Sequence, residues 1–302
     1  MPLSPITLFV YNRPEHTKRT VEALLKNELA SQCELFIFSD APKNEQAKKD
    51  VQKVREYIKT ISGFKTVTVI ERENNFGLAK SIITGVTDIV NKHGKVIVLE
   101  DDLIASPYFL KYMNGALDFY EHEEKVISIH GYIYPVSEEM PETFFIKGAD
   151  CWGWATWKRG WDLFEADGQK LLDELKAKNL TKSFDLGGYP YTQMLQAQIN
   201  GLNSSWAIRW YASAFLRDKL TLYPGKSLIS NLGFDDSGTH TGSTNAFKTA
   251  LTEKPITIGQ IPISENLSAL NLIKKYFNSP KMRLLSLSIK LKYYFKLLKK
   301  YV

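Results

Sequence analysis

Three carboxylates directly follow an apolar run at positions 96 to 102, Val-Ile-Val-Leu-Glu-Asp-Asp. The apolar run is typical of a buried strand, so Glu100, Asp101 and Asp102 come where that strand ends. Adjacent carboxylates repel one another and resist burial unless a cation or a hydrogen-bonding ligand compensates them. Their oxygens suit a hard divalent cation, which can carry a phosphorylated substrate. The alternative is a helix-capping turn, since acidic residues also suit the first turn of a helix.

Other polar residues follow three further strand-like segments. Tyr11, Asn12 and Arg13 come at the end of the first, Asp40 after the second and Asn75 after the third. In α/β sheets ligands bind outside the carboxyl ends of the strands, so we expect these residues to lie near the triplet and to bind a nucleotide. The alternatives are a surface charge for Arg13 and an Asx turn for Asp40.

Two common glycine-rich phosphate loops are absent. The sequence contains no Gly-x-x-x-x-Gly-Lys-Ser/Thr and no Gly-x-Gly-x-x-Gly after a strand, so backbone amides of those loops do not neutralise a diphosphate here. A carboxylate-held Mn²⁺ or Mg²⁺ would do so, because it bridges phosphate oxygens.

Strand-like and helix-like segments alternate through the first 130 residues. Connections of helix length between successive strands predict an α/β fold with a mainly parallel sheet flanked by helices. The second half is more irregular and includes a tryptophan-rich run at 151–161 that we expect to complete a site. The expected strands are 6–11, 34–39, 65–71, 95–99 and 126–129, and the expected helices are 14–26, 45–61, 78–91 and 106–120.

Composition indicates a globular protein with an unusual tail. Of 302 residues, 44% are hydrophobic, which is ordinary for a globular chain. Two cysteines, Cys33 and Cys151, make neither a disulfide framework nor a four-ligand zinc site, so we expect reduced thiols of an intracellular protein. We find no signal-peptide pattern and no apolar stretch near the roughly 20 residues of a spanning helix.

The net charge of +6 belongs to the tail. After Glu265 there are nine basic residues and no acidic one, which leaves the first 265 residues at 30 minus 33, or −3. This distribution does not favour a nucleic-acid partner for the body. Residues 281–302 have a helical period that places leucines on one face and lysines on the other. This pattern is typical of a helix on an anionic membrane surface. The alternative is a helix docked on the body or on a dimer partner.

The triplet after its strand, the order of the strands and Asp40 together resemble the nucleotide-sugar glycosyltransferases of the GT-A fold. The likeness covers roughly residues 5–190 and is most specific from Glu100 to Phe109. Within that family the chain looks like N-acetylglucosaminyltransferase I and bacterial transferases of similar plan. The resemblance implies a Rossmann-like GT-A fold and metal-dependent, inverting transfer from a nucleoside diphosphate sugar, with UDP favoured. The acceptor would be a hydroxyl of a glycan or a lipid-linked molecule, as in bacterial surface glycan assembly.

The resemblance also implies roles for the residues at the strand ends. Asp102 would ligate the Mn²⁺ or Mg²⁺, while Glu100 and Asp101 would face the donor sugar and its ribose. Arg13 and Asp40 would hold the nucleotide base.

Four residues of the second half match the segment beside the donor sugar and the acceptor. They are Asp150, Trp152, Gly153 and Trp154. Aromatic faces pack against sugar rings and glycine permits close approach, but tryptophans in such a run also pack in cores.

Two later residues complete the implied site. Asp185 matches the acidic position of the general base, which takes the proton of the acceptor hydroxyl; the alternative is a turn residue before Gly187 and Gly188. His240, in the polar loop 233–241, would be a second ligand of the metal or diphosphate, unless it is a structural or exposed histidine.

The predicted organisation is a GT-A domain over residues 1–265, with a nucleotide-sugar half at about 1–130 and an acceptor side at about 131–265. A basic amphipathic helical tail follows at 266–302. We expect a cytoplasmic protein, peripheral on the inner face of the cell membrane. Two other functions are alternatives to this one. A sugar-nucleotide pyrophosphorylase needs a glycine-rich basic loop that residues 11–14 do not offer, and a noncatalytic carbohydrate or membrane adaptor needs neither metal nor nucleotide.

Overall fold

The computed structural model of the chain describes residues 2–235 and 244–301. Its main sheet has the strand order β3-β2-β1-β4-β8-β6-β9-β7. Neighbours from β3 to β4 are parallel, as are β6 and β9, whereas β8 and β7 run antiparallel to their neighbours. These strands are β1 (Ile6–Val10), β2 (Glu34–Ser39), β3 (Thr66–Glu71), β4 (Lys95–Glu100), β6 (Val126–His130), β7 (Thr143–Lys147), β8 (Trp154–Trp157) and β9 (Leu220–Pro224).

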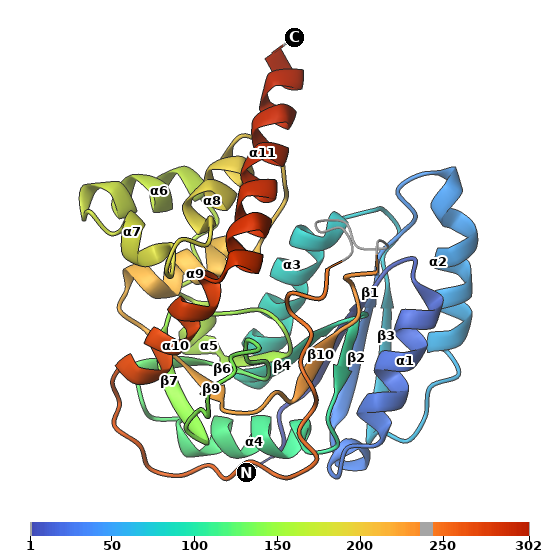
Figure 1. Ribbon diagram of the computed structural model, residues 1–302. Coiled ribbons are helices and arrows are strands. Elements are labelled where there is room, and N and C mark those ends of the chain that lie inside the picture. The colour runs from blue at the N-terminus through green and yellow to red at the C-terminus, as the bar shows by residue number, and fades with distance from the viewer. Residues whose placement is uncertain (1, 236–243, 302) are drawn as a thin grey trace.

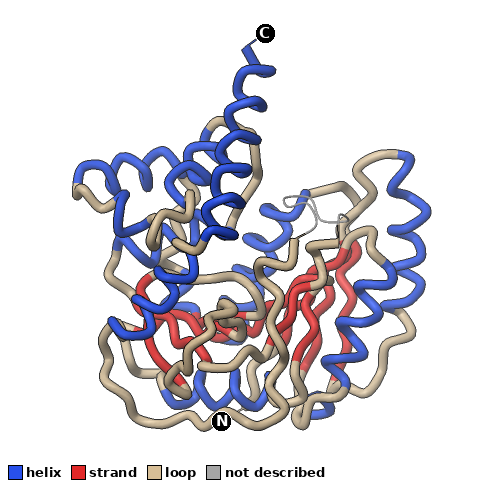
Figure 2. The backbone as a smooth tube through the Cα atoms, in the orientation of Figure 1, coloured by secondary structure: helices blue, strands red, loops and turns tan. Residues whose placement is uncertain are grey.

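Helices cover both faces of this sheet (Figures 1 and 2). One buried cluster joins the sheet to α1, α2 and α4, and a second joins it to α3, α5 and α9. The helices are α1 (Pro14–Leu25), α2 (Glu45–Ile58), α3 (Gly77–His93), α4 (Phe109–Phe119), α5 (Lys158–Trp161), α6 (Gly168–Ala177), α7 (Thr181–Phe184), α8 (Tyr191–Ile199), α9 (Ala207–Leu216), α10 (Leu267–Phe277) and α11 (Pro280–Tyr301), with a 3₁₀ turn at Ala30–Gln32.

Local sequence explains where the elements of the first half begin and end. Neighbouring side chains of β1 enter opposite clusters, Leu8 one and Phe9 the other, because strand side chains alternate between faces. Pro14 opens α1. The side chain of Asn44 caps α2, and Gly94 ends α3 in the left-handed conformation with φ +77°.

The predicted α/β fold with a mainly parallel sheet flanked by helices is confirmed, and so is the C-terminal helix. Each expected element of the first half is present, with ends that differ by a few residues. The second half is more ordered than its sequence indicated, since it supplies α5 to α9 and the strands β7 to β9. Strand β8 lies between β4 and β6, antiparallel to both. A small second sheet pairs β10 (Ile229–Asn231) with β5 (Leu103–Ala105).

The chain ends in α10 and α11, and α11 projects beyond the body (Figure 1). None of the helices in the described ranges is long and apolar enough to cross a membrane. Both cysteines are free, and Cys33 is buried.

Candidate active site

The carboxyl ends of β1, β2 and β4 meet at one edge of the sheet. Phe9 pairs with Glu100 and Val10 with Ser39 across the parallel strands, so the residues that follow these strands lie close together. Tyr11 and Asn12 are half-buried at this edge. The Tyr11 hydroxyl accepts a hydrogen bond from the backbone N–H of Lys43 at 2.9 Å.

Arg13 forms an ion pair with two members of the triplet. Its Nη2 contacts Oδ1 of Asp101 and lies 3.0 Å from Oδ2 of Asp102. Burial by itself would lower the pKa of the guanidinium, but the two carboxylates raise the pKa overall. Arg13 therefore provides a resident positive charge for the triplet, a pairing that the sequence did not predict.

One arginine does not balance three carboxylates. Burial, followed by the charges of Asp102 and Asp101, raises the pKa of Glu100 to about 8. Burial also raises the pKa of Asp101 to about 6, although Arg13 opposes this shift. Both shifts come first from burial, and the neighbouring carboxylates add to them.

A loop from the second half of the chain lies directly on Asp102. The pairing of β10 with β5 brings this loop to the triplet, and the N–H of Leu232 donates to the backbone carbonyl of Asp102 at 2.8 Å. A Cβ on Gly233 would collide with Oδ2 of Asp102, so a larger residue there would have to displace the Asp102 carboxylate or the loop. Next along the loop, Asp235 Oδ2 lies 3.0 Å from Nε2 of His16. His240 lies outside the described residues.

These carboxylates fit a divalent cation that takes its other ligands from a diphosphate. Within residues 2–235 and 244–301, no group of three His, Cys, Asp or Glu side chains is arranged to hold an ion alone. Mg²⁺ typically takes one or two carboxylates and fills its other positions with phosphate oxygens and water. Asp102, with Glu100 beside it, offers such a partial site with uncompensated negative charge.

Asp40 organises the loop that leads into α3. Its Oδ1 accepts hydrogen bonds from the N–H groups of Ala41 and Phe76 at 2.9 and 2.8 Å. Its Oδ2 accepts from the N–H of Gly77 at 2.8 Å and from Nδ2 of Asn75 at 3.1 Å. Asp40 and Asn75 are thus brought together as expected at this edge. Their contact with a nucleotide stays a prediction.

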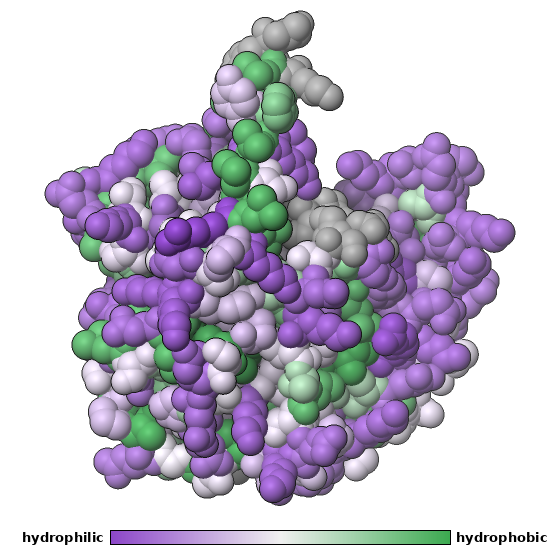
Figure 3. Space-filling view, viewed as in Figure 1, coloured by the Kyte–Doolittle hydropathy of each residue, from purple (hydrophilic) through white to green (hydrophobic). Residues whose placement is uncertain are grey.

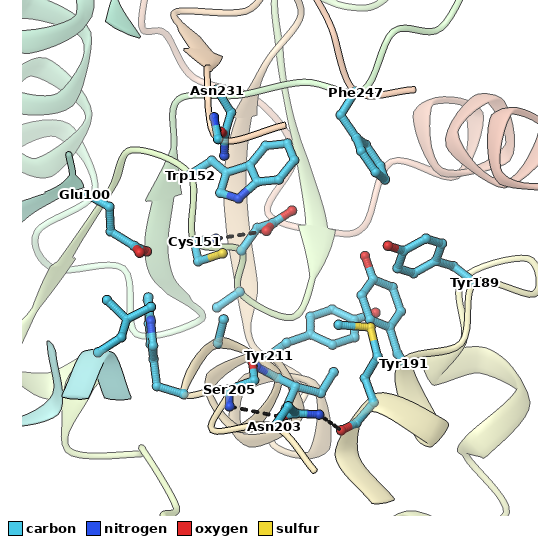
Figure 4. Close-up of a pocket in the computed structure, with 18 of the residues that line it drawn as sticks. Glu100, Cys151, Trp152, Tyr189, Tyr191, Asn203, Ser205, Tyr211, Asn231 and Phe247 are labelled. Atoms are coloured by element: carbon cyan, nitrogen blue, oxygen red, sulfur yellow. Dashed lines mark hydrogen bonds between the residues drawn. The ribbon is translucent and has the colours of Figure 1, made fainter. Parts of the chain in front are cut away.

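A cavity of about 280 Å³ opens beside the triplet. Glu100 faces it from one side and Tyr189 and Tyr191 from the other, with Trp152 and Phe247 between (Figure 4). The described residues that line it are Arg13, Leu78, Glu100, Asp102, Tyr134, Ala149, Asp150, Cys151, Trp152, Leu186, Tyr189, Tyr191, Met194, Asn203, Ser205, Trp206, Ala207, Ile208, Tyr211, Tyr223, Asn231, Gly233, Phe234, Phe247 and Tyr293.

Asp150 is a cavity carboxylate outside the strand-end triplet. It lies between β7 and β8, and its Oδ2 accepts a hydrogen bond from the Tyr134 hydroxyl at 2.6 Å. Its Oδ1 accepts from the N–H of Cys151 at 2.8 Å. Burial and then the charge of Asp150 raise the pKa of Tyr134 well above its ordinary value, so the phenol stays protonated and donates to Asp150.

The tryptophan run divides between the cavity and the core. Trp152 lines the cavity, as predicted for a sugar-binding residue. Trp154 is fully buried and packs against Trp161, Trp206 and Trp210 with ring centroids 5.2–5.8 Å apart in this group. Trp154 is therefore a core residue, which was the alternative to sugar binding for this run.

Gly153 also has a packing reason. Its φ is +61°, and a Cβ there would collide with the side chain of Ile229. Gly153 is not among the lining residues, unlike its neighbour Trp152.

Asp185, the predicted base, is not a lining residue of the described cavity. Its carboxylate accepts a hydrogen bond from the N–H of Thr192 at 2.7 Å. Burial raises the pKa of Asp185. Its position beside the first turn of α8 favours the turn alternative, and its role as a base stays a prediction.

Sequence reasoning did not identify the tyrosines of the cavity. Tyr134, Tyr191, Tyr211, Tyr223 and Tyr293 come from five separate segments. The local signal was the Tyr-Pro-Tyr at 189–191, but nothing in the sequence showed that the other segments converge on it.

Comparison with known proteins gives one family and several distant structures. The model of the family described as Glycosyl transferase family 2 matches residues 6–169, which is more than half of the chain. No curated protein gave a significant sequence match. The likeness to N-acetylglucosaminyltransferase I therefore rests on the sequence motif alone.

Similar solved structures share little sequence with the chain. A mannosyltransferase from Pyrobaculum calidifontis, solved with GDP-mannose and Mn²⁺, is 13% identical, with a TM-score of 0.33 over 44% of this chain and 36% of that one. TarS residues 1–349 from S. aureus are 12% identical, with a TM-score of 0.42 over 77% and 61%. A second TarS structure is 13% identical, with a TM-score of 0.42 over 74% and 36%. The chain thus spans less than two thirds of each of these relatives.

Proposed function

The chain belongs to glycosyl transferase family 2, and from this premise we propose that it transfers a sugar from a nucleoside diphosphate sugar, with UDP as carrier, to a hydroxyl of a glycan or lipid-linked acceptor with inversion. The observation that carries this proposal is that the strand-end carboxylates Glu100 and Asp102 and the separate carboxylate Asp150 line one cavity. Family membership favours this function over a pyrophosphorylase or an adaptor. The transferred sugar, hexose or N-acetylhexosamine, is not specified by these residues.

The donor would lie along the carboxyl edge of the sheet. Asp102 would hold a Mn²⁺ or Mg²⁺ ion, with Glu100 beside it. When bound, the ion would offset the charge that develops on the leaving diphosphate. The nucleotide would lie over Tyr11, Asn12 and the loop that Asp40 and Asn75 fix, because this loop follows the neighbouring strand ends.

We propose Asp150 in place of Asp185 as the group that takes the acceptor proton. Inversion requires a base on the side of the attacking hydroxyl. Asp150 lines the cavity, and Tyr134 fixes one of its oxygens at 2.6 Å. Asp185 is not among the residues that line this cavity.

A membrane contact is part of the proposal. Four leucines of α11, here called the leucine stripe, are 45–71% exposed: Leu284, Leu287, Leu291 and Leu298. Figure 3 shows apolar side chains along the projecting helix. Each of the neighbouring basic residues would contribute about 1 kcal/mol at an anionic surface. Such binding would hold the protein peripherally on the inner face of the cell membrane, where it could reach a lipid-linked acceptor of surface glycan assembly.

Titration calorimetry tests the donor site. UDP should bind wild-type protein in Mn²⁺ and much more weakly in EDTA, because Asp102 and the diphosphate would share the ion. Asp102→Asn should abolish the metal-dependent part, while Asp88→Asn, an exposed position on α3, serves as the matched control. Equal UDP binding with and without Mn²⁺ would refute the metal-dependent donor site.

Vesicle flotation tests the membrane contact. Replacing all four leucines of the stripe with serine should release the protein from vesicles with anionic lipid, since the buried apolar area is lost. Unchanged flotation would exclude this surface as the membrane contact.

A further inference from the structure

The cavity has two chemically different ends. Glu100 lies on one side of it and Tyr189 and Tyr191 on the other (Figure 4). Asp102, the second neighbour of Glu100 in the chain, also lines the cavity together with its partner Arg13. Burial raises the pKa of Tyr191 and of Tyr211 well above the ordinary value, and the charge of Asp150 adds to it. These phenols therefore stay uncharged near neutral pH. They offer hydroxyl groups and aromatic faces but no charge.

The charged groups of the cavity disfavour an anionic acceptor. Among its described lining residues, Arg13 supplies the positive side chain and Glu100, Asp102 and Asp150 the negative ones. The guanidinium of Arg13 is already paired with Asp101 and Asp102. A phosphate or carboxylate beside Asp150 would thus be repelled without a compensating cation. An uncharged sugar ring is not repelled by these carboxylates, and it can stack on the aromatic rings and hydrogen-bond to the phenol hydroxyls.

The last helix contributes to the aromatic end of the cavity. Tyr293 of α11 lines the cavity and is half-buried, and its hydroxyl accepts a hydrogen bond from Nδ2 of Asn203 at 3.3 Å. One turn on, Lys296 Nζ donates to the carbonyl of Leu202 at 3.2 Å. These bonds fix α11 against the loop that precedes α9.

The face of α11 that carries Tyr293 is distinct from the leucine stripe. Met282 and Ser286 are buried on the body, and Leu285 and Ile289 pack against its core. Tyr293 continues this row at helical spacing. The helix is therefore held on the body by one face, as in the docked alternative, while the other face stays exposed. Membrane contact of the exposed face stays a proposal.

We propose that the aromatic end of the cavity binds an uncharged sugar of the acceptor, and that Tyr293 of α11 completes its wall. This inference rests on the proposed function, because it takes Asp150 as the group that meets the acceptor hydroxyl. It adds the chemical class of the acceptor and a task for α11 other than membrane contact.

An array of neutral, sulfated, phosphorylated and uronic-acid oligosaccharides, probed with labelled full-length protein in UDP and Mn²⁺, tests the acceptor class. We expect the bound glycans to end in neutral sugars, and acidic counterparts of the same glycan to bind about tenfold more weakly because of the cavity carboxylates. Preferential binding of acidic glycans, or no binding to any glycan, would overturn the proposal. Either result would leave the donor site standing if calorimetry still shows metal-dependent UDP binding, whereas loss of that binding would refute the proposed function itself.

The chain offers a matched pair of variants for the role of α11. Tyr293→Ala should weaken the best array ligand about fivefold, the effect of losing one aromatic contact. Tyr294→Ala removes the same side chain from the next position, which is 58% exposed, and should keep the wild-type affinity. Tyr293→Phe keeps the ring and should recover most of the loss. Equal affinities of the Tyr293→Ala and Tyr294→Ala proteins would exclude Tyr293 from the acceptor wall.

Discussion

Replacing Glu100 with glutamine should change how stability depends on pH. The folded protein raises the pKa of Glu100 from an ordinary value of 4.5 to about 8. The folded state therefore binds this proton more tightly than the unfolded chain, and stability falls as pH rises between these two values. Glutamine has nearly the same shape and no charge, so Glu100→Gln removes this loss.

The size of the effect follows from the shift. A difference of about 3.5 pKa units at about 1.36 kcal/mol each sets an upper limit near 5 kcal/mol. Glu100 is partly exposed and lies beside two other carboxylates and Arg13, so solvent screening and relaxation should reduce the effect to about 1–2 kcal/mol. At pH 4.0, below the ordinary pKa of Glu100, the variant and the wild type should be nearly equal. At pH 8.5 the variant should be more stable by that amount.

Urea denaturation in EDTA, followed by tryptophan fluorescence at pH 4.0, 5.5, 7.0 and 8.5, measures the difference. Glu22→Gln provides the control, because the Glu22 side chain is 53% exposed on α1 and its replacement should leave the slope unchanged. If the stability of Glu100→Gln and wild type changes in parallel from pH 4.0 to 8.5, the reasoning about the buried charge of Glu100 is refuted.

Four further variants test the cavity and its surroundings. Asp150→Asn should lower kcat about 10²- to 10⁴-fold, because it removes the proposed base. If Asp185→Asn lowers kcat more than Asp150→Asn does, the base is Asp185. Trp154→Ala should destabilise the fold by about 3–5 kcal/mol in thermal or urea unfolding, because it empties a fully buried site. Trp152→Ala should raise the acceptor KM and leave the free energy of unfolding close to that of the wild type. An unchanged KM together with a large loss of stability would contradict the division of the tryptophan run. Gly233→Ala should weaken metal-dependent UDP binding about 10- to 100-fold in calorimetry, since its Cβ would displace Asp102; unchanged affinity would show that the loop yields instead.

The first half of the fold could be predicted from sequence because its information is local. Apolar strands such as Ile6–Val10 and Lys95–Glu100 alternate with amphipathic helices, and parallel pairing follows from the crossover lengths. The same rule places Asp40 and Glu100 at one edge of the sheet. The partners of these residues are less local, and the ion pair between Arg13 and Asp101 joins positions 88 residues apart.

The second half depends on contacts between distant segments. Strand β8 pairs with β4 although about fifty residues separate them, and β10 pairs with β5 across more than a hundred. Neither pairing has a hairpin turn that would reveal it in the sequence. The cavity shares this property, since its tyrosines come from distant elements, among them α9, β9 and α11. A tyrosine such as Tyr223 looks like any strand residue until its neighbours are known.

The two faces of α11 decide which experiments can separate its tasks. Deleting residues 281–302 would remove the leucine stripe and Tyr293 together, and it would also remove the buried Met282 and so expose the core on which it packs. A loss of vesicle binding and a loss of acceptor affinity would then appear in the same protein, and neither could be assigned. Point substitutions avoid this problem, because Leu291 and Tyr293 are close in sequence but lie on different faces of the helix. A protein with a serine stripe that still binds its glycan, beside a Tyr293→Ala protein that still floats with vesicles, would establish that α11 performs two separate tasks.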